Sequence, residues 1–238
     1  MSAYDAFAPI YEDWASIMTE DVPFYVELAR EADGSVVELA VGTGRVAREI
    51  ARATGRRVIG TDSSPAMLAL AREAADRDGV ELELVEQDMR DFELEEPAAL
   101  ICSPFRSLLH LPTWGDRRRV FERVAAALRP GGRFAWNAFV FDPLFAAELS
   151  GTDRRHGETE IWSRSDYVPT DSRIDVTAWT RDDRSDTRTV SLWWIGRSEW
   201  EGLIDVAGLE VEALYGWFDR RPFDDESREF VWVTRRPA

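Results

Sequence analysis

Residues 36–47 read Val36-Val37-Glu38-Leu39-Ala40-Val41-Gly42-Thr43-Gly44-Arg45-Val46-Ala47. This stretch has the pattern of a short buried strand that ends in an acid, a turn with two glycines and the start of a helix. In an open α/β sheet, ligands bind outside the carboxyl end of a strand, where such a turn lies. Glycine has no Cβ, so the chain can turn tightly there and a ligand can lie against the backbone. The stretch therefore predicts a ligand site in an α/β fold.

The two glycines do not identify the ligand by themselves. The spacing Gly42-x-Gly44-x-x-Ala47 also fits the dinucleotide fingerprint, and an ordinary tight turn would use the same glycines. A dinucleotide would place its anionic pyrophosphate at this turn, where the carboxylate of Glu38 would oppose it. A carboxylate here suits a cationic group instead, such as an α-ammonium or a sulfonium.

With Glu38 included, the stretch resembles the first motif of class I S-adenosylmethionine-dependent methyltransferases, E-x-A/G-x-G-x-G. The resemblance implies S-adenosyl-L-methionine as the cofactor and S-adenosyl-L-homocysteine as the product. It also implies a Rossmann-like α/β fold, with a mostly parallel sheet of seven strands, the last one antiparallel, and helices on both faces. The same resemblance places five residues at the cofactor: Glu38, Ala40, Gly42, Thr43 and Gly44.

A second acid ends the next predicted strand, which covers residues 57–62. Asp62 can accept hydrogen bonds from both hydroxyls of a ribose, a role that acids have in nucleoside sites. A helix follows, with a serine cap and an early proline. The spacing Asp62-x-Ser64-x-x-Met67 resembles the second methyltransferase motif, which places Asp62, Ser63 and Met67 at the cofactor. The alternative is that Asp62 only caps the helix.

A third acid follows the strand predicted over residues 82–86, in the segment Gln87-Asp88-Met89. The segment resembles a family motif in which the acid accepts from the exocyclic amine of adenine and the next residue packs on the ring. By this resemblance Gln87, Asp88 and Met89 lie at the adenine, and an ordinary surface acid is the alternative. Three acids in this order, each at a strand end, form a more specific signal than any one of them.

The fourth predicted strand, residues 98–102, is followed by Ser103-Pro104-Phe105-Arg106-Ser107-Leu108-Leu109-His110-Leu111. This run resembles the segment F-N-S-L-x-H-L of the family, a loop that faces the transferred methyl group. The resemblance places Ser103 and Phe105 at the cofactor. His110 is the candidate general base, because imidazole titrates near working pH. A structural role is the alternative for a lone histidine.

Two further polar residues are candidate contacts of the methyl acceptor. Arg106, which stands where the family commonly has asparagine, would bind an acidic group of the acceptor or pair with a surface acid. Asn137 lies near the functional end of a strand predicted over 133–140 and would hydrogen-bond the acceptor. A helix over 114–128 and a Pro-Gly-Gly break over 129–132 precede that strand.

The N-terminal residues 3–18 predict an amphipathic helix, broken or kinked at Pro9. They contain the pattern Tyr4-Asp5-x-Phe7-Ala8-x-x-Tyr11-Glu12. The pattern resembles the lid of glycine N-methyltransferase and of aminosugar N,N-dimethyltransferases, where the motif usually ends in Tyr-Asp. The resemblance implies that Tyr4 and Tyr11 close over the cofactor, with Tyr11 also beside the reacting groups. Plain core packing of the helix is the alternative.

The full chain predicts a single methyltransferase domain in four parts. These are an N-terminal helical lid (1–32), a cofactor-binding core (33–141), an antiparallel insert or cap (142–197) and a C-terminal helix and hairpin (198–238). Helices are also predicted over 21–32, 45–54 and 198–207, and the final hairpin over 209–215 and 228–235.

The insert is predicted by apolar alternation with period two, which is typical of strands. Its strands cover 160–168, 173–181 and 189–196, with turns at 169–171 and 182–186, after a helix and loop over 142–156. By resemblance, such an insert covers the acceptor and makes subunit contacts, so we expect a homodimer through it. Some aromatic residues are expected to line an aromatic acceptor cavity beneath it: Phe105, Trp136, Phe139, Phe141, Trp179, Trp193, Trp194, Trp217 and Phe218.

Composition excludes several classes of function. The net charge of −16 disfavours a nucleic acid partner, because phosphates would be repelled. Every basic residue is arginine, which excludes lysine chemistry, and the single Cys102 excludes an intrachain disulfide. With only His110 and His156 besides, no metal site is expected. No apolar run approaches the roughly 20 residues of a membrane span, and acids occupy the N-terminus, so we expect no membrane partner and a cytoplasmic protein.

The favoured function is methyl transfer from S-adenosylmethionine to a nitrogen of a small molecule, an amine or an N-heterocycle, by in-line displacement. Transfer to oxygen is the second choice. An NAD(P)-dependent oxidoreductase is a competing hypothesis, which Glu38, Asp88 and the absence of lysine oppose. A cofactor-binding protein without transfer activity is the third, because methyl transfer requires few chemical groups of the protein.

Overall fold

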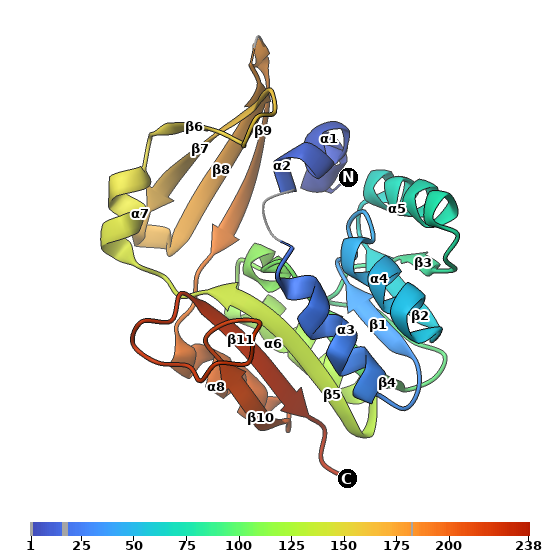
Figure 1. The fold of residues 1–238 in the computed structure, drawn as a ribbon. Helices are drawn as coiled ribbons and strands as arrows, with labels where there is room; N and C mark the ends of the chain where they lie inside the picture. Colours follow the sequence, from blue (N-terminus) through green and yellow to red (C-terminus); the bar gives the residue numbers. More distant parts are fainter. Residues whose placement is uncertain (1, 16–18, 182) are drawn as a thin grey trace.

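The computed structural model describes residues 2–15, 19–181 and 183–238. Its centre is a sheet of seven strands in the order β10-β11-β5-β4-β1-β2-β3 (Figure 1). The strands are β1 (Val36–Leu39), β2 (Val58–Asp62), β3 (Glu83–Glu86), β4 (Ala98–Ser103), β5 (Leu128–Phe139), β10 (Glu210–Tyr215) and β11 (Glu229–Arg235). β1 to β5 pair in parallel, whereas β11 is antiparallel to both neighbours. The predicted Rossmann-like sheet with an antiparallel last strand is confirmed.

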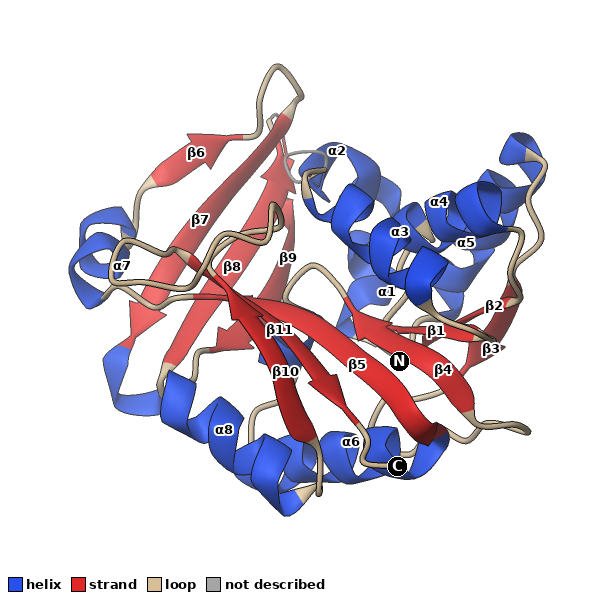
Figure 2. Cartoon of the chain, turned by 60° about the horizontal axis from the view of Figure 1, so that its bottom comes forward, coloured by secondary structure: helices blue, strands red, loops and turns tan. Residues whose placement is uncertain are grey.

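Helices cover both faces of this sheet (Figure 2). They are α3 (Asp21–Glu31), α4 (Arg45–Thr54), α5 (Pro65–Asp78), α6 (Trp114–Ala127) and α8 (Arg197–Val206). Two of them begin where the sequence supplies a cap: Ser64 accepts from the Met67 amide, and Thr113 from the Asp116 amide. Such capping fixes where each helix starts relative to the strand before it.

The core divides into one apolar layer on each face of the sheet. α3 and α4 pack on one face, and α6 and α8 on the other. Trp136 of β5 stacks on Trp232 of β11 at 5.9 Å between ring centroids, and both are fully buried on the α6 side. Trp136 is therefore a core residue and does not line an acceptor cavity, since a strand in mid-sheet has both faces covered.

Strand β5 starts earlier than the sequence predicts. Leu128 already pairs with Ala98, and the register then shifts before Arg133 pairs with Leu100. Within this irregular part, the Gly131 amide donates to the Arg236 carbonyl at 2.9 Å. The predicted break over 129–132 is therefore an irregularity inside the strand. Hydrogen bonds of Gly131 and Gly132 with Arg236 of the C-terminal segment hold these residues in the sheet.

A second sheet, with four strands in the order β6-β7-β8-β9, forms the insert. Its strands are β6 (Asp153–Arg155), β7 (Ile161–Val168), β8 (Arg173–Thr180) and β9 (Asp183–Trp193), preceded by α7 (Pro143–Leu149). The prediction of three strands was wrong, because β6 is too short to show alternation. The predicted turn over 182–186 was wrong too: β9 starts at Asp183, and the exposed side chains of residues 184–187 conceal its period from the sequence.

The N-terminal segment consists of α1 (Ala3–Phe7), the 3₁₀ turn η1 (Ala8–Ile10) and α2 (Tyr11–Ala15). The predicted break at Pro9 is confirmed, whereas the predicted helical residues 16–18 lie outside the described residues. The segment lies between the insert and α5 (Figure 1). Phe7 and Ile10 form a small apolar cluster there with Met67 of α5 and Val190 of β9. This cluster attaches the lid to both parts of the molecule.

Across the ranges that the structure covers, no helix combines the length and apolar character needed to cross a bilayer.

Candidate active site

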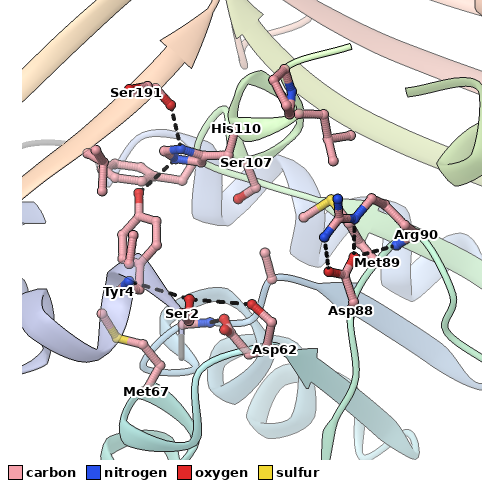
Figure 3. Close-up of a pocket in the computed structure, with 18 of the residues that line it drawn as sticks. Ser2, Tyr4, Asp62, Met67, Asp88, Met89, Arg90, Ser107, His110 and Ser191 are labelled. Carbon is pink, nitrogen blue, oxygen red and sulfur yellow. Dashed lines mark hydrogen bonds and ion pairs between the residues drawn. The ribbon is translucent and has the colours of Figure 1, made fainter. Parts of the chain in front are cut away.

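A cavity of about 580 Å³ lies where the carboxyl ends of the parallel strands meet the lid and the insert (Figure 3). This is within the range of roughly 300–1,000 Å³ that small-molecule sites have. Twelve of the predicted site residues line it: Tyr4, Tyr11, Ala40, Gly42, Asp62, Ser63, Met67, Gln87, Asp88, Met89, Phe105 and His110. The structure therefore brings residues from the lid, three strand ends and the loop after β4 to one place.

The glycine turn forms the floor of the cavity beside β1. Gly42 and Gly44 have φ of 56° and 75°, the left-handed region that glycine adopts without strain. A Cβ at Gly42 would lie 3.6 Å from the Tyr11 hydroxyl. Ala40 also has a positive φ of 53°, although it has a side chain. The tight turn leaves room between the backbone and the lid that a side chain would fill.

Asp62 at the end of β2 holds this turn. Its Oδ2 accepts from the Gly42 amide at 2.9 Å and its Oδ1 from the Ser64 amide at 2.8 Å. Burial nevertheless raises the pKa of Asp62, because its hydrogen bonds offset only part of the lost solvation. Each carboxylate oxygen can still accept a further hydrogen bond from the cavity. The residue is thus poised to bind two hydroxyls of a ligand.

Glu38 lies on β1, next to the strand of Asp62, and is more deeply buried than Asp62. Its side chain is 3% exposed, and its Oε2 has no hydrogen-bond partner among the described residues. Burial raises the pKa of Glu38 to about 8, although the charge of Arg45 acts in the opposite direction. A buried carboxylate oxygen without a partner is costly, so it indicates a place for a ligand that donates hydrogen bonds. Glu38 does not itself line the cavity.

Asp88 follows β3, on the opposite side of Asp62 from Glu38. Arg90 binds it with a fork: Nη2 donates to Oδ2 at 2.6 Å and Nε to Oδ1 at 2.9 Å (Figure 3). These bonds hold the pKa of Asp88 below its usual range. Arg90, which sequence reasoning missed, also donates to Asp116. Asp88 is thereby ionised and fixed, with Met89 beside it in the cavity wall.

His110 joins three elements of the molecule (Figure 3). Its Nδ1 lies 3.0 Å from the Ser191 carbonyl of β9, and its Nε2 lies 2.7 Å from the Tyr4 hydroxyl of the lid. Burial lowers the pKa of His110 to about 4, so the ring is neutral at pH 7. A carbonyl only accepts, so Nδ1 carries the proton and Nε2 accepts from Tyr4. Both ring nitrogens are engaged.

The lid is also tied to the start of α5. Asp5 accepts from the Ser64 hydroxyl at 2.6 Å, and the Ser63 hydroxyl lies 3.4 Å from that of Ser2. From the insert, Arg188 donates to the Ala6 carbonyl at 2.5 Å. These bonds hold α1 over the cavity in a closed position.

Two of the predicted acceptor contacts lie outside the cavity wall. Arg106 donates to both carboxylate oxygens of Glu229, at 3.1 and 2.7 Å. Asn137 donates to the same Glu229 at 2.6 Å and accepts from Tyr25 at 3.0 Å. The side chains of Asn137, Glu229 and Tyr25 are fully buried. Arg106 and Asn137 thus belong to one polar network at the loop after β4, in which both donate to Glu229.

The other predicted site residues that do not line the cavity are Glu38, Thr43, Gly44 and Ser103. All four are buried just behind its wall. Trp193, one of the aromatic residues expected at the acceptor, also lines the cavity. Residues that sequence reasoning missed complete the lining: Ser2, Ala3, Arg90, Ser107, Leu111, Pro112, Thr189, Val190 and Ser191. No sequence pattern pointed to Thr189, Val190 and Ser191 of β9, because alternation with period two predicts a strand but does not show which segment the strand packs against. Among the described residues, no cluster of side chains has the composition of a metal site.

Comparison with known proteins gives concordant matches. Residues 36–132 match a family model described as a methyltransferase domain. The chain is 30% identical to dTDP-4-amino-2,3,4,6-tetradeoxy-D-glucose N,N-dimethyltransferase of Saccharopolyspora spinosa, over 86% of this chain and 82% of that protein. It is 25% identical to the cypemycin N-terminal methyltransferase of Streptomyces sp., over 99% and 95%.

Among solved structures, an S-adenosylmethionine-dependent methyltransferase from Clostridium acetobutylicum ATCC 824 superposes with a TM-score of 0.82. The two chains are 16% identical, and each is covered over its full length. This match concerns the fold, which includes the insert as well as the central sheet.

Proposed function

This chain belongs to the S-adenosylmethionine-dependent methyltransferases that act on small molecules, and on that premise we propose that it methylates a nitrogen atom. Its cofactor is S-adenosylmethionine, and the buried Glu38 oxygen without a partner and the open glycine turn fit that group. When bound, the cofactor supplies a methyl group already activated on its sulfonium, so the chain needs no nucleophile of its own.

One observation favours nitrogen over oxygen as the acceptor: each basic group of the cavity wall has another role or stays protonated. Both ring nitrogens of His110 are used, Asp88 is held by Arg90, and Asp62 holds the glycine turn and is placed for the ribose hydroxyls. Burial raises the pKa of Tyr4 and of Tyr11, so both stay protonated. A hydroxyl acceptor needs a base to ionise it, whereas an amine that arrives neutral does not.

The activities for which two relatives are named support the same proposal. One is named as an N,N-dimethyltransferase of a dTDP-linked amino sugar, and the other as the cypemycin N-terminal methyltransferase. The first name gives an amino group as the acceptor, and the second an N-terminus. The contribution of this chain is then to position the amine and to limit the access of water, for which the lid over the cavity is placed.

The experiment is turnover with matched acceptor pairs that differ in one group, an amine against the corresponding hydroxyl. Aminosugar nucleotides, peptides with a free N-terminus and aromatic amines would each be tested with their hydroxy counterparts, and the methylated atom located by mass spectrometry. We expect methylation of the amine only. A methyl group on the hydroxyl compounds and none on any amine would contradict the proposal.

Replacing His110 with alanine is expected to weaken S-adenosylhomocysteine binding about 5- to 10-fold and to lower turnover, because the lid loses its hydrogen bond to the core. The shape of the pH–rate profile between pH 6 and 8 is expected to stay the same, since His110 does not titrate there. Calorimetry and initial rates measure both. His156→Ala is the control, as His156 does not line the cavity. If the pH–rate profile of the wild type has a limb near pH 6.5 that the variant lacks, His110 is instead the base.

We propose three further properties, which concern the acceptor, the oligomeric state and the location of the protein. We expect an aromatic group on the acceptor, which Phe105 and Trp193 in the cavity wall support. A homodimer through the insert and a location in the cytoplasm are the other two. Sedimentation of the purified protein would measure the oligomeric state.

A further inference from the structure

The loop after β4 has a strained backbone at the wall of the cavity. Phe105 and Arg106 have φ of 56° and 64°, the left-handed region that residues with a Cβ seldom adopt. Among the described residues, they are the only two non-glycine neighbours along the chain that share this conformation. Each such residue costs free energy, so it persists only where other contacts hold it in place. The contacts that hold this pair therefore help to form the site.

The strained pair determines which side chains of the loop face the cavity. Phe105 lines the cavity, and Arg106 directly precedes the 3₁₀ turn η2 (Ser107–His110), whose first and last residues line it as well. The Leu109 amide donates to the Arg106 carbonyl at 2.9 Å, so the turn is built on Arg106. Arg106 itself does not line the cavity. A change of its φ would redirect the chain between Phe105 and η2, and both would leave their places in the wall.

A buried acid of the last strand holds Arg106. Glu229 of β11 is fully buried, and its two carboxylate oxygens accept from the Arg106 guanidinium at 3.1 and 2.7 Å. Asn137 of β5 donates to the same carboxylate at 2.6 Å and accepts from the Tyr25 hydroxyl at 3.0 Å. A forked pair of bonds fixes the direction of a guanidinium as well as its position. Glu229 therefore anchors the strained loop to the sheet.

We propose that Glu229 is a positioning residue of the ligand site: through Arg106 it keeps the loop in the left-handed conformation that puts Phe105 and η2 into the cavity wall. The inference rests on the family's cofactor and not on the nitrogen acceptor proposed above. If Arg106 touched the ligand itself, binding would depend on its side chain. If Arg106 only shapes the loop, binding depends on its φ, which glycine adopts without strain. Alanine and glycine at this position therefore distinguish the two roles.

The test is calorimetry with S-adenosylhomocysteine on Arg106→Ala and Arg106→Gly. Without the guanidinium the loop is no longer held, so alanine leaves the left-handed region, whereas glycine still populates it. The apparent affinity falls with the fraction of molecules in the binding-competent conformation. We expect Arg106→Ala to bind about 10-fold more weakly than the wild type, and Arg106→Gly to bind about fivefold more tightly than Arg106→Ala.

Glu229→Gln tests the anchor itself, because the neutral amide cannot accept both bonds of the guanidinium. It should weaken S-adenosylhomocysteine about 3- to 10-fold, although Glu229 does not line the cavity. Adding Arg106→Gly to Glu229→Gln should restore most of the affinity, whereas adding Arg106→Ala should not. These double variants also cover the case in which Arg106→Ala alone does not fold, since it leaves Glu229 buried without its cation.

Arg118 supplies the matched control, because it is an exposed arginine of α6 that is ion-paired with Glu122. Arg118→Ala and Arg118→Gly should both leave the affinity unchanged, and glycine should lower the melting temperature more than alanine, as it does in a helix.

Two results would overturn the proposal. Equal losses of affinity for Arg106→Ala and Arg106→Gly would mean that the arginine side chain contacts the ligand. Unchanged affinity with a lower melting temperature would mean that the ion pair only joins the loop to the sheet. If the wild type binds no S-adenosylhomocysteine, this proposal fails together with the cofactor. A failure of amine methylation alone leaves it intact.

Discussion

Asp62→Ala is expected to weaken the binding of S-adenosylhomocysteine about 100-fold, one of the two largest effects that the structure predicts. The variant would lose the carboxylate that is placed to accept two ribose hydroxyls. It would also release the Gly42 and Ser64 amides, which the two oxygens now hold at 2.9 and 2.8 Å. Calorimetry with S-adenosylhomocysteine measures the affinity.

The same replacement should change the stability of the ligand-free protein less than it changes the affinity, because two opposing effects accompany it. The lost hydrogen bonds to the Gly42 and Ser64 amides destabilise the folded chain, whereas removal of a carboxyl group whose pKa is raised by burial relieves a desolvation cost. Asp62→Asn should weaken binding almost as much, because its amide donor would face one of the two backbone donors. Glu73→Ala, which removes an exposed acid from α5, the helix that follows β2, is the charge control. A melting temperature that falls while affinity is retained would remove Asp62 from the ligand site.

The sequence was sufficient to predict those site residues whose positions follow from the order of neighbouring strands and turns along the chain. Glu38, Asp62 and Asp88 occur at the ends of strands that follow one another along the chain and lie side by side in the sheet. In a parallel sheet, such strand ends share one edge, so finding the strands also locates the acids. Local signals were therefore enough for these residues and for the glycine turn.

The rest of the site depends on partners that are distant in sequence. Arg106 is bound by Glu229 of the last strand, a partner that no motif connects with the loop after β4. Ser191 reaches His110 only because the insert folds back on the core. The sequence left two roles open for each residue: general base or structural residue for His110, and contact of the acceptor or pairing with a surface acid for Arg106. In the folded chain, hydrogen bonds to residues distant in sequence engage both side chains.

The second large effect is expected from Glu38: the affinity for S-adenosylhomocysteine should rise with pH. With a pKa of about 8 in the free protein, Glu38 is mostly protonated at pH 6. The α-ammonium of the ligand binds the ionised form, so binding at pH 6 must first remove a proton, and this cost disappears as pH approaches 8. The affinity should rise up to about 10-fold per pH unit between pH 6 and 8 and then level off.

Glu38→Gln separates this effect from other titrations, because the amide fills the same space without ionising. The variant is expected to bind S-adenosylhomocysteine weakly, with little change between pH 6 and 8. Stability gives an independent measure: the folded protein holds a proton on Glu38 that the unfolded chain releases from about pH 4.5 upward. Stability of the free wild type should therefore fall as pH rises from about 4.5 to 8, and Glu38→Gln should lose that slope. Equal slopes in both proteins would mean that another group controls the binding.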